Sequence, residues 1–330
     1  MKFLISFLFL PIFAFANTVS EGGQKGFVKI KEGREIYVDW TYARPGQPTV
    51  VLVNGLTYTT QQWDRFSDEL SGLGVGVLRY DPMGMGETLL KYAPVLADIA
   101  VEEQVEDLRL LLKTLKIPQP YSLVGLSYGG GLGLLFASKY PKEIRHLIAM
   151  APYTQPMASQ DQWIQSQIWY VRQVQPWNPA SDDDLYAFFF RQIVYTTYPT
   201  VEPIVLQNPY KLEAVLRLGL GIRKFDAYKA SSSLPKNSLY LVIAGKDQYV
   251  PRGIMEEFWT VVPQSARACK IIINNSEHKI PEAVPRFSAA IVKEIVTGNP
   301  AFKNGQDMKA DPYSGEVVYE GGRLNLPKEF

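Results

Sequence analysis

The chain has 330 residues, and its 34 Lys and Arg side chains nearly balance 33 Asp and Glu side chains. A chain with a net charge of only +1 lacks the concentrated positive charge that binds nucleic acid or an anionic membrane surface, so we expect neither partner. The single cysteine, Cys269, cannot form a disulfide within the chain, and its neighbours Ile271–Ile273 favour a buried, unreactive thiol. A packed apolar core must therefore hold the fold together.

The first residues are typical of an export signal. Lys2 precedes the apolar run 3–13, and residues 14–16 (Ala-Phe-Ala) have the small-x-small form that signal peptidase recognises. The run is shorter than the roughly 20 residues that span a bilayer, although an N-terminal anchor and a buried strand stay open as alternatives. We expect cleavage after Ala16 and a mature periplasmic or secreted protein without a stable membrane span.

After the signal, apolar runs typical of strands alternate with segments whose apolar residues recur at helical spacing. In chain order, the expected strands are 27–31, 35–43, 49–54, 75–80, 121–126, 146–150, 238–244 and 268–273. The expected helices are 60–70, 99–115, 129–140, 254–261 and 282–296. Strand–helix–strand units of this kind predict an α/β fold with a mostly parallel, twisted sheet flanked by helices.

Residues 153–234 interrupt this alternation and are rich in aromatic residues at helical spacing. Within them, Ser181 followed by three aspartates is a good helix start, because the hydroxyl can cap the first turn and acids face the positive helix end. We interpret 153–234 as a helical cap inserted into a core formed by 17–152 and 235–297. The alternative is that the aromatic residues only pack the cap against itself.

Residues 298–330 are expected to form a polar C-terminal tail, rich in Pro and Gly. Within it, the runs 317–320 and 323–326 flank a Gly-Gly pair, a pattern that favours a small hairpin.

The strongest chemical signal is Gly-Leu-Ser-Tyr-Gly at residues 125–129, between an expected strand and an expected helix. A sharp strand-to-helix turn holds such a serine in a strained conformation, and small neighbours let the backbones approach. Gly125, Gly129, Gly130 and Gly131 supply that room. The helix that follows also directs its positive end at developing negative charge. Ser127 is therefore the predicted nucleophile.

A serine hydroxyl needs an adjacent base, and the chain has two histidines. His278 follows the last expected core strand, so it lies at the same sheet edge as Ser127. His146 stands at the start of a strand, where a packing or hydrogen-bonding role is expected. We therefore assign the base to His278.

The base needs a carboxylate that orients it, and Asp247 directly follows the expected strand 238–244. The chain order Ser127, Asp247, His278 is the one used by hydrolases with this strand–turn–helix nucleophile. Asp81 is a rival, but it precedes Ser127 and is better suited to stabilise the glycine-rich turn that follows it. Glu277 is a weaker rival beside the base.

With these motifs, residues 26–152 and 235–297 resemble the α/β-hydrolase superfamily, in the capped group that includes esterases, lipases, thioesterases, cofactor-free haloperoxidases and proline iminopeptidases. The resemblance implies that the backbone N–H groups of Leu56 and Tyr128 form the oxyanion hole. Where the family usually has His-Gly after the third strand, this chain has Asn54-Gly55, a departure that bears on the shape and polarity of the pocket. Dehalogenases and epoxide hydrolases of the family use aspartate as nucleophile, so a serine argues against both.

The expected activity is hydrolysis of a small-molecule carboxylic ester with an apolar acyl or alkyl group, through a Ser-His-Asp triad and an acyl-enzyme. An aminopeptidase of the proline iminopeptidase type and a non-catalytic ligand-binding homologue are the alternatives. No histidine pair has metal-ligand spacing, and the loose glycine pattern at 72–76 precedes a strand where a dinucleotide-binding loop would follow one. We therefore expect no metal and no cofactor.

Overall fold

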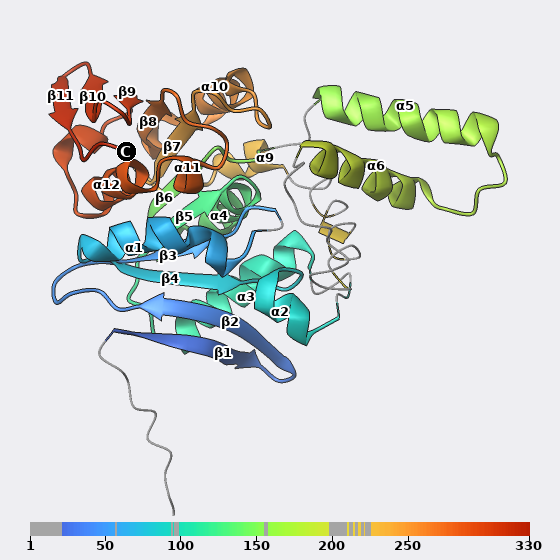
Figure 1. Cartoon of the computed structure of the whole chain (residues 1–330), viewed down its shortest axis with the longest axis horizontal. Helices are drawn as coiled ribbons and strands as arrows, with labels where there is room; N and C mark the ends of the chain where they lie inside the picture. Colours follow the sequence, from blue (N-terminus) through green and yellow to red (C-terminus); the bar gives the residue numbers. More distant parts are fainter. Residues whose placement is uncertain are drawn as a thin grey trace, which may run out of the picture.

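The computed structural model describes residues 22–56, 58–93, 95, 99–154, 158–197, 210, 214, 217, 218, 221 and 226–330. These residues form an 11-stranded sheet with helices packed on its faces (Figure 1). The expected signal, residues 1–16, lies outside the described residues. Of the helices that the structure describes, none combines the length and apolarity needed to cross a bilayer.

The strands follow the order β1-β2-β4-β3-β5-β6-β7-β8-β9-β10-β11 across the sheet. Their bounds are Gly23–Lys31 (β1), Arg34–Thr41 (β2), Thr49–Val53 (β3), Gly76–Asp81 (β4), Tyr121–Leu126 (β5), Ile144–Met150 (β6), Leu239–Ala244 (β7), Arg267–Ile273 (β8), Gln306–Asp311 (β9), Glu316–Tyr319 (β10) and Gly322–Asn325 (β11). All neighbours from β4 to β9 pair in parallel, and the strands at either end pair antiparallel. The expected mostly parallel α/β sheet is confirmed.

Helices connect the parallel strands and cover both faces of the sheet (Figure 1). Their bounds are Asp64–Gly72 (α1), Gly86–Lys91 (α2), Val101–Thr114 (α3), Tyr128–Lys139 (α4), Ala158–Val174 (α5), Asp182–Thr197 (α6), Ala227–Ser231 (α9), Arg252–Val261 (α10), Ile280–Ala283 (α11) and Pro285–Val296 (α12). Helix α1 packs against α12, while α4 contacts both α3 and α9.

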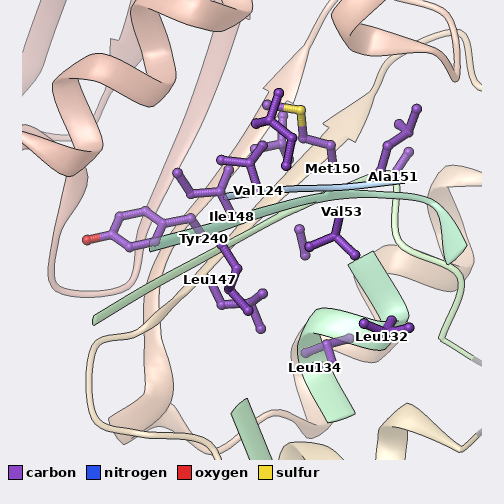
Figure 2. Close-up of a cluster of buried hydrophobic side chains, with 14 of the residues drawn as sticks. Val53, Val124, Leu132, Leu134, Leu147, Ile148, Met150, Ala151 and Tyr240 are labelled. Atoms are coloured by element: carbon purple, nitrogen blue, oxygen red, sulfur yellow. The ribbon is translucent and has the colours of Figure 1, made fainter. Parts of the chain in front are cut away.

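The core lies between the sheet and these helices, and its centre holds α4 against the middle strands. Figure 2 shows Val53 and Leu147 on the side of the sheet that faces Leu132 and Leu134 of α4. The fit is close, because a Cβ on Gly133 of α4 would lie 2.7 Å from a methyl carbon of Leu147. Packing of this density fixes where the amino end of α4 lies relative to the strands.

Two stretches differ from the sequence-based expectation. The single helix expected over 282–296 is two helices, α11 and α12, because Pro285 lacks an N–H and disfavours the helical conformation of Val284 (φ −140°, ψ 60°). The segment after Gly298 is not a separate tail: β9 pairs in parallel with β8 and extends the sheet. The expected hairpin within it is confirmed as β10 and β11.

Helices α5 and α6 lie side by side as a hairpin that extends away from the sheet (Figure 1). The expected helix start is confirmed, since the Ser181 hydroxyl accepts the Asp184 N–H at 3.1 Å and the Asp184 carboxylate accepts the Ser181 N–H at 3.1 Å. This reciprocal pairing satisfies two backbone donors at the helix end. The full extent of the cap stays a prediction, because most of 198–225 lies outside the described residues.

Candidate active site

Ser127 occupies the one-residue turn between β5 and α4. Its backbone has φ 51° and ψ −114°, a conformation that costs a non-glycine residue on the order of 1–3 kcal/mol. The neighbouring loop holds it there: the Ser127 N–H donates to the Met150 carbonyl at 2.9 Å, and its carbonyl accepts the Tyr153 N–H at 3.0 Å. The turn places this side chain, partly exposed, at the carboxyl edge of the sheet.

The glycines around this turn are required by the close approach of backbones. A Cβ on Gly125 would lie 2.3 Å from the Gly129 carbonyl oxygen, and a Cβ on Gly129 would lie 2.1 Å from the Val53 oxygen. A Cβ on Gly130 would lie 2.8 Å from Pro152. The sharp strand-to-helix turn expected from the sequence is confirmed, and only glycine fits at these positions.

Asp247 and His278 are brought into direct contact at the same edge of the sheet. His278 Nδ1 lies 2.8 Å from Asp247 Oδ2 and 3.0 Å from Oδ1, and the two side chains are 3% and 0% exposed. A carboxylate can only accept, so Nδ1 carries the proton and Nε2 is left able to accept another. The ring of Tyr249 stands edge-on to the imidazole with centroids 5.0 Å apart.

Hydrogen bonds between the loops after β7 and β8 produce this contact. The Gly245 N–H donates to the Ile273 carbonyl at 2.9 Å, and the Lys246 N–H donates to the Ser276 carbonyl at 2.9 Å. These bonds continue the strand pairing beyond both strand ends. Asp247 is then held by its own loop, since its Oδ1 accepts the N–H groups of Tyr249 and Val250, each at 2.8 Å.

Leu56 and Tyr128 lie where β3 and β5 end next to one another. Tyr128 is the first residue of α4, so its N–H belongs to the first turn, which has no acceptor within the helix. The Leu56 loop packs against the same turn, because a Cβ on Gly55 would lie 3.4 Å from the Leu126 oxygen. Further along this loop, the Tyr58 hydroxyl donates to the Glu282 carboxylate, which ties it to α11 just after His278.

Asn54, which replaces the usual histidine, lies at the centre of a buried polar network. Its Nδ2 lies 3.3 Å from Asp81 Oδ1 and 3.4 Å from the Tyr58 carbonyl, and its Oδ1 accepts the indole N–H of Trp63 at 2.9 Å. The side chain is 1% exposed. Asn54 therefore braces the loop that carries Leu56. The sequence marked this position as a departure but did not show its partners, of which Asp81 is 27 positions away.

The two rival carboxylates have other surroundings. Asp81 accepts the N–H groups of Thr60 at 2.7 Å and Glu87 at 3.0 Å, so it fixes the turn after β4 as expected. Burial raises the pKa of the Asp81 carboxyl, although the hydrogen bonds from Glu87, Thr60 and Asn54 act in the opposite direction. Glu277 is exposed on the His278 loop. Of these three acids, Asp247 is the one in contact with the imidazole.

The second histidine and the cysteine are core residues, as expected. His146 Nδ1 lies 2.9 Å from the Ser122 hydroxyl, and its ring stands edge-on to Tyr240 at 5.7 Å. Burial, with smaller contributions from Arg145 and Lys303, lowers the pKa of His146 to about 4. Cys269 is fully buried, and burial raises the pKa of its thiol far above the ordinary value, so the reactive thiolate does not form.

The lowered pKa of His146 predicts a loss of stability in acid. Because the unfolded chain binds this proton near pH 6.5 and the folded chain only near pH 4, the free energy of unfolding falls as pH decreases through this window, by about 3 kcal/mol. Urea unfolding measures the free energy of unfolding of the wild type and of His146→Gln. The difference between the two values should shrink by about that amount from pH 7 to pH 4. Parallel pH profiles for the two proteins would contradict the assignment.

Comparison with known proteins gives a consistent picture. A family profile described as the alpha/beta hydrolase fold matches residues 48–282. A curated proline iminopeptidase of Saccharolobus solfataricus (strain ATCC 35092 / DSM 1617 / JCM 11322 / P2) is 26% identical over 155 residues, which is 46% of this chain and 48% of that protein. The chain thus matches about half the length of this relative.

Solved structures share the same fold at lower identity. MGS-M2, an alpha/beta hydrolase enzyme from a Medee basin deep-sea metagenome library, is 19% identical with a TM-score of 0.61, over 82% of this chain and 97% of that one. A thermophilic esterase from Thermogutta terrifontis is 20% identical with a TM-score of 0.59, over 83% of this chain and 98% of that one. At these identities the likeness establishes the fold alone.

Proposed function

Because the chain belongs to the alpha/beta hydrolase family, we propose that it is a serine hydrolase that acts on carboxylic esters with an apolar acyl or alkyl group. The observation that carries the proposal is the buried contact of 2.8 Å between His278 Nδ1 and Asp247, at the sheet edge where Ser127 follows β5. Ser127 is the nucleophile, His278 the base and Asp247 the orienting acid. The three come from the ends of β5, β7 and β8.

In the proposed reaction, His278 Nε2 takes the hydroxyl proton of Ser127 as Oγ attacks the ester carbonyl. The backbone N–H groups of Leu56 and Tyr128 stabilise the oxyanion, and each lowers the activation barrier by about 3 kcal/mol. His278 then returns the proton to the departing alcohol, which leaves an acyl group on Ser127. Water, deprotonated by the same imidazole, attacks this acyl-enzyme, and His278 returns the proton to Ser127 Oγ as the acid is released.

An aminopeptidase is the second candidate, because the curated relative of similar sequence is a proline iminopeptidase. Such an enzyme needs an acid that binds the substrate amine, and the acids at the start of α6 are the ones that the sequence offers. Asp184 is engaged in the helix cap, however, and Asp182 pairs with Arg172 at 2.7 Å. These contacts favour a structural role for Asp182 and Asp184, and we rank the ester first.

A series of p-nitrophenyl esters of increasing acyl length, run beside aminoacyl p-nitroanilides, tests the substrate class. We expect kcat/KM to rise about fourfold per methylene until the pocket is filled, since burying each CH₂ contributes about 0.8 kcal/mol. Faster turnover of the aminoacyl amides would instead establish an aminopeptidase. Folded protein that turns over neither and resists a fluorophosphonate probe, which labels activated serines, would indicate a binding protein without catalysis.

A further inference from the structure

Helix α5 and the turn that follows it present large apolar side chains to solvent. Five of them, between 43% and 78% exposed, form what we call the aromatic face: Trp163, Trp169, Tyr170, Val174 and Trp177. Ile164 and Ile168 of the same helix are buried, and the ring of Trp163 stands edge-on to Phe189 of α6 with centroids 5.9 Å apart. Exposed apolar side chains gathered in this way mark an interaction surface more often than isolated ones do.

Helical geometry aligns most of these side chains in one stripe. Trp163 and Tyr170 are seven residues apart and Val174 is eleven from Trp163, so at about 100° per residue they point within about 40° of one another. Trp177 lies in the turn after the helix, where helical spacing no longer applies. The stripe therefore lies along one flank of the exposed side of α5, about 100° from the buried Ile164, and Trp169 points about 120° away from it.

The aromatic face carries no formal charge. Between its apolar residues, the exposed positions of α5 are glutamine or serine: Gln162, Gln165, Ser166 and Gln173. The helix has two charged residues, Asp161 and Arg172, and both are only partly exposed. The Arg172 guanidinium turns to the α5–α6 connection, where it donates to the Ala180 carbonyl at 2.6 Å and to Asp182. An uncharged surface complements an uncharged partner.

We propose that the aromatic face binds the surface of an electrically neutral lipid layer. Tryptophan and tyrosine combine an apolar ring with a polar N–H or O–H, and such side chains settle at the boundary between lipid and water. Glutamine amides between them can hydrogen-bond to headgroups. The α5–α6 hairpin extends away from the sheet with α5 on its outer side (Figure 1), so a flat surface can reach the helix along its length.

A second copy of the chain is a poorer partner for this surface. A helix of 17 residues is about 26 Å long, and one side of it covers about 260 Å². A stable protein–protein interface buries about 800 Å² per partner. A lipid surface needs no such area and no matching shape, because its molecules rearrange around the inserted rings.

Sedimentation with phosphatidylcholine vesicles tests the proposal without reference to catalysis. The wild type should bind, with a blue shift of tryptophan fluorescence, and the triple variant Trp163→Gln, Tyr170→Gln, Trp177→Gln should bind at least about tenfold more weakly. Tyr313→Gln, an equally exposed aromatic in the β9–β10 turn, is the matched control and should bind as the wild type does. Affinity should be the same at low and high salt.

Other results would overturn it. One is an absence of vesicle binding by the wild type. Another is equal binding by the triple variant when its melting temperature is unchanged. A third is binding to phosphatidylglycerol vesicles alone, when high salt abolishes that binding. Self-association in analytical ultracentrifugation that the triple variant loses would assign the face to a second copy. None of these measurements depends on Ser127, so each result can be read separately from the proposed esterase activity.

Discussion

Replacing Ser127 with alanine should lower kcat on an ester substrate by on the order of 10⁴-fold or more, because no acyl-enzyme can form without the Oγ atom. The fold should be retained, since the strained backbone at φ 51° is held by neighbouring loops and alanine carries no larger side chain into the turn. Steady-state rates on a p-nitrophenyl ester and labelling by a fluorophosphonate probe measure the loss.

The control for this experiment is Ser232→Ala, which removes an exposed hydroxyl after α9 and should keep both turnover and labelling. Near-normal turnover by purified Ser127→Ala, with contaminating hydrolases excluded by probe labelling of the preparation, would refute the assignment of the nucleophile.

Asp247→Asn should lower kcat by about 10⁴-fold while the fold persists. The new amide can keep its carbonyl oxygen on the N–H groups of Tyr249 and Val250, which leaves Nδ2 to face His278 Nδ1. Two donors oppose each other across this contact of 2.8 Å, which favours the tautomer with the proton on Nε2 over an Nδ1–H that Oδ1, at 3.0 Å, can still accept. His278 can then no longer accept the proton of Ser127.

Glu277→Gln is the matched control, because it removes the carboxylate adjacent to the base in sequence. Glu277 is exposed, and its loss should change kcat less than about twofold. A large effect of Glu277→Gln combined with a small effect of Asp247→Asn would transfer the role of the acid to Glu277. Circular dichroism of both variants separates a catalytic loss from an unfolded one.

The central sheet was predictable because its buried strands are short, continuous apolar runs. The strand expected over 121–126 coincides with β5, and the one expected over 49–54 exceeds β3 by one residue. β9 was missed since it alternates polar residues with the buried Met308 and Ala310, a pattern too short to distinguish from a loop. Its pairing with β8 joins residues 37 positions apart in the sequence, a separation that no local pattern can reveal.

The identities of the candidate site residues followed from motifs placed after strands, since parallel strands bring their carboxyl ends to one edge. The bracing of that edge could not be predicted in the same way. Asn54 contacts Asp81, 27 positions away, and the Tyr58 hydroxyl reaches Glu282, 224 positions away. Contacts of this kind depend on packing of the complete fold. The break at Pro285 was also missed, although the proline itself is a sufficient reason to predict it.

β8, the strand before His278, is bordered on one side by β7 and on the other by β9. Its residues from Cys269 to Ile273 are largely apolar, and an unpaired edge of this kind would invite strand addition by other molecules and polymerisation. The sheet ends instead at β11, a short strand of sequence Gly-Arg-Leu-Asn that is mostly exposed. By pairing with β8, the segment after α12 thus removes an apolar sheet edge next to His278 at which other molecules could add strands.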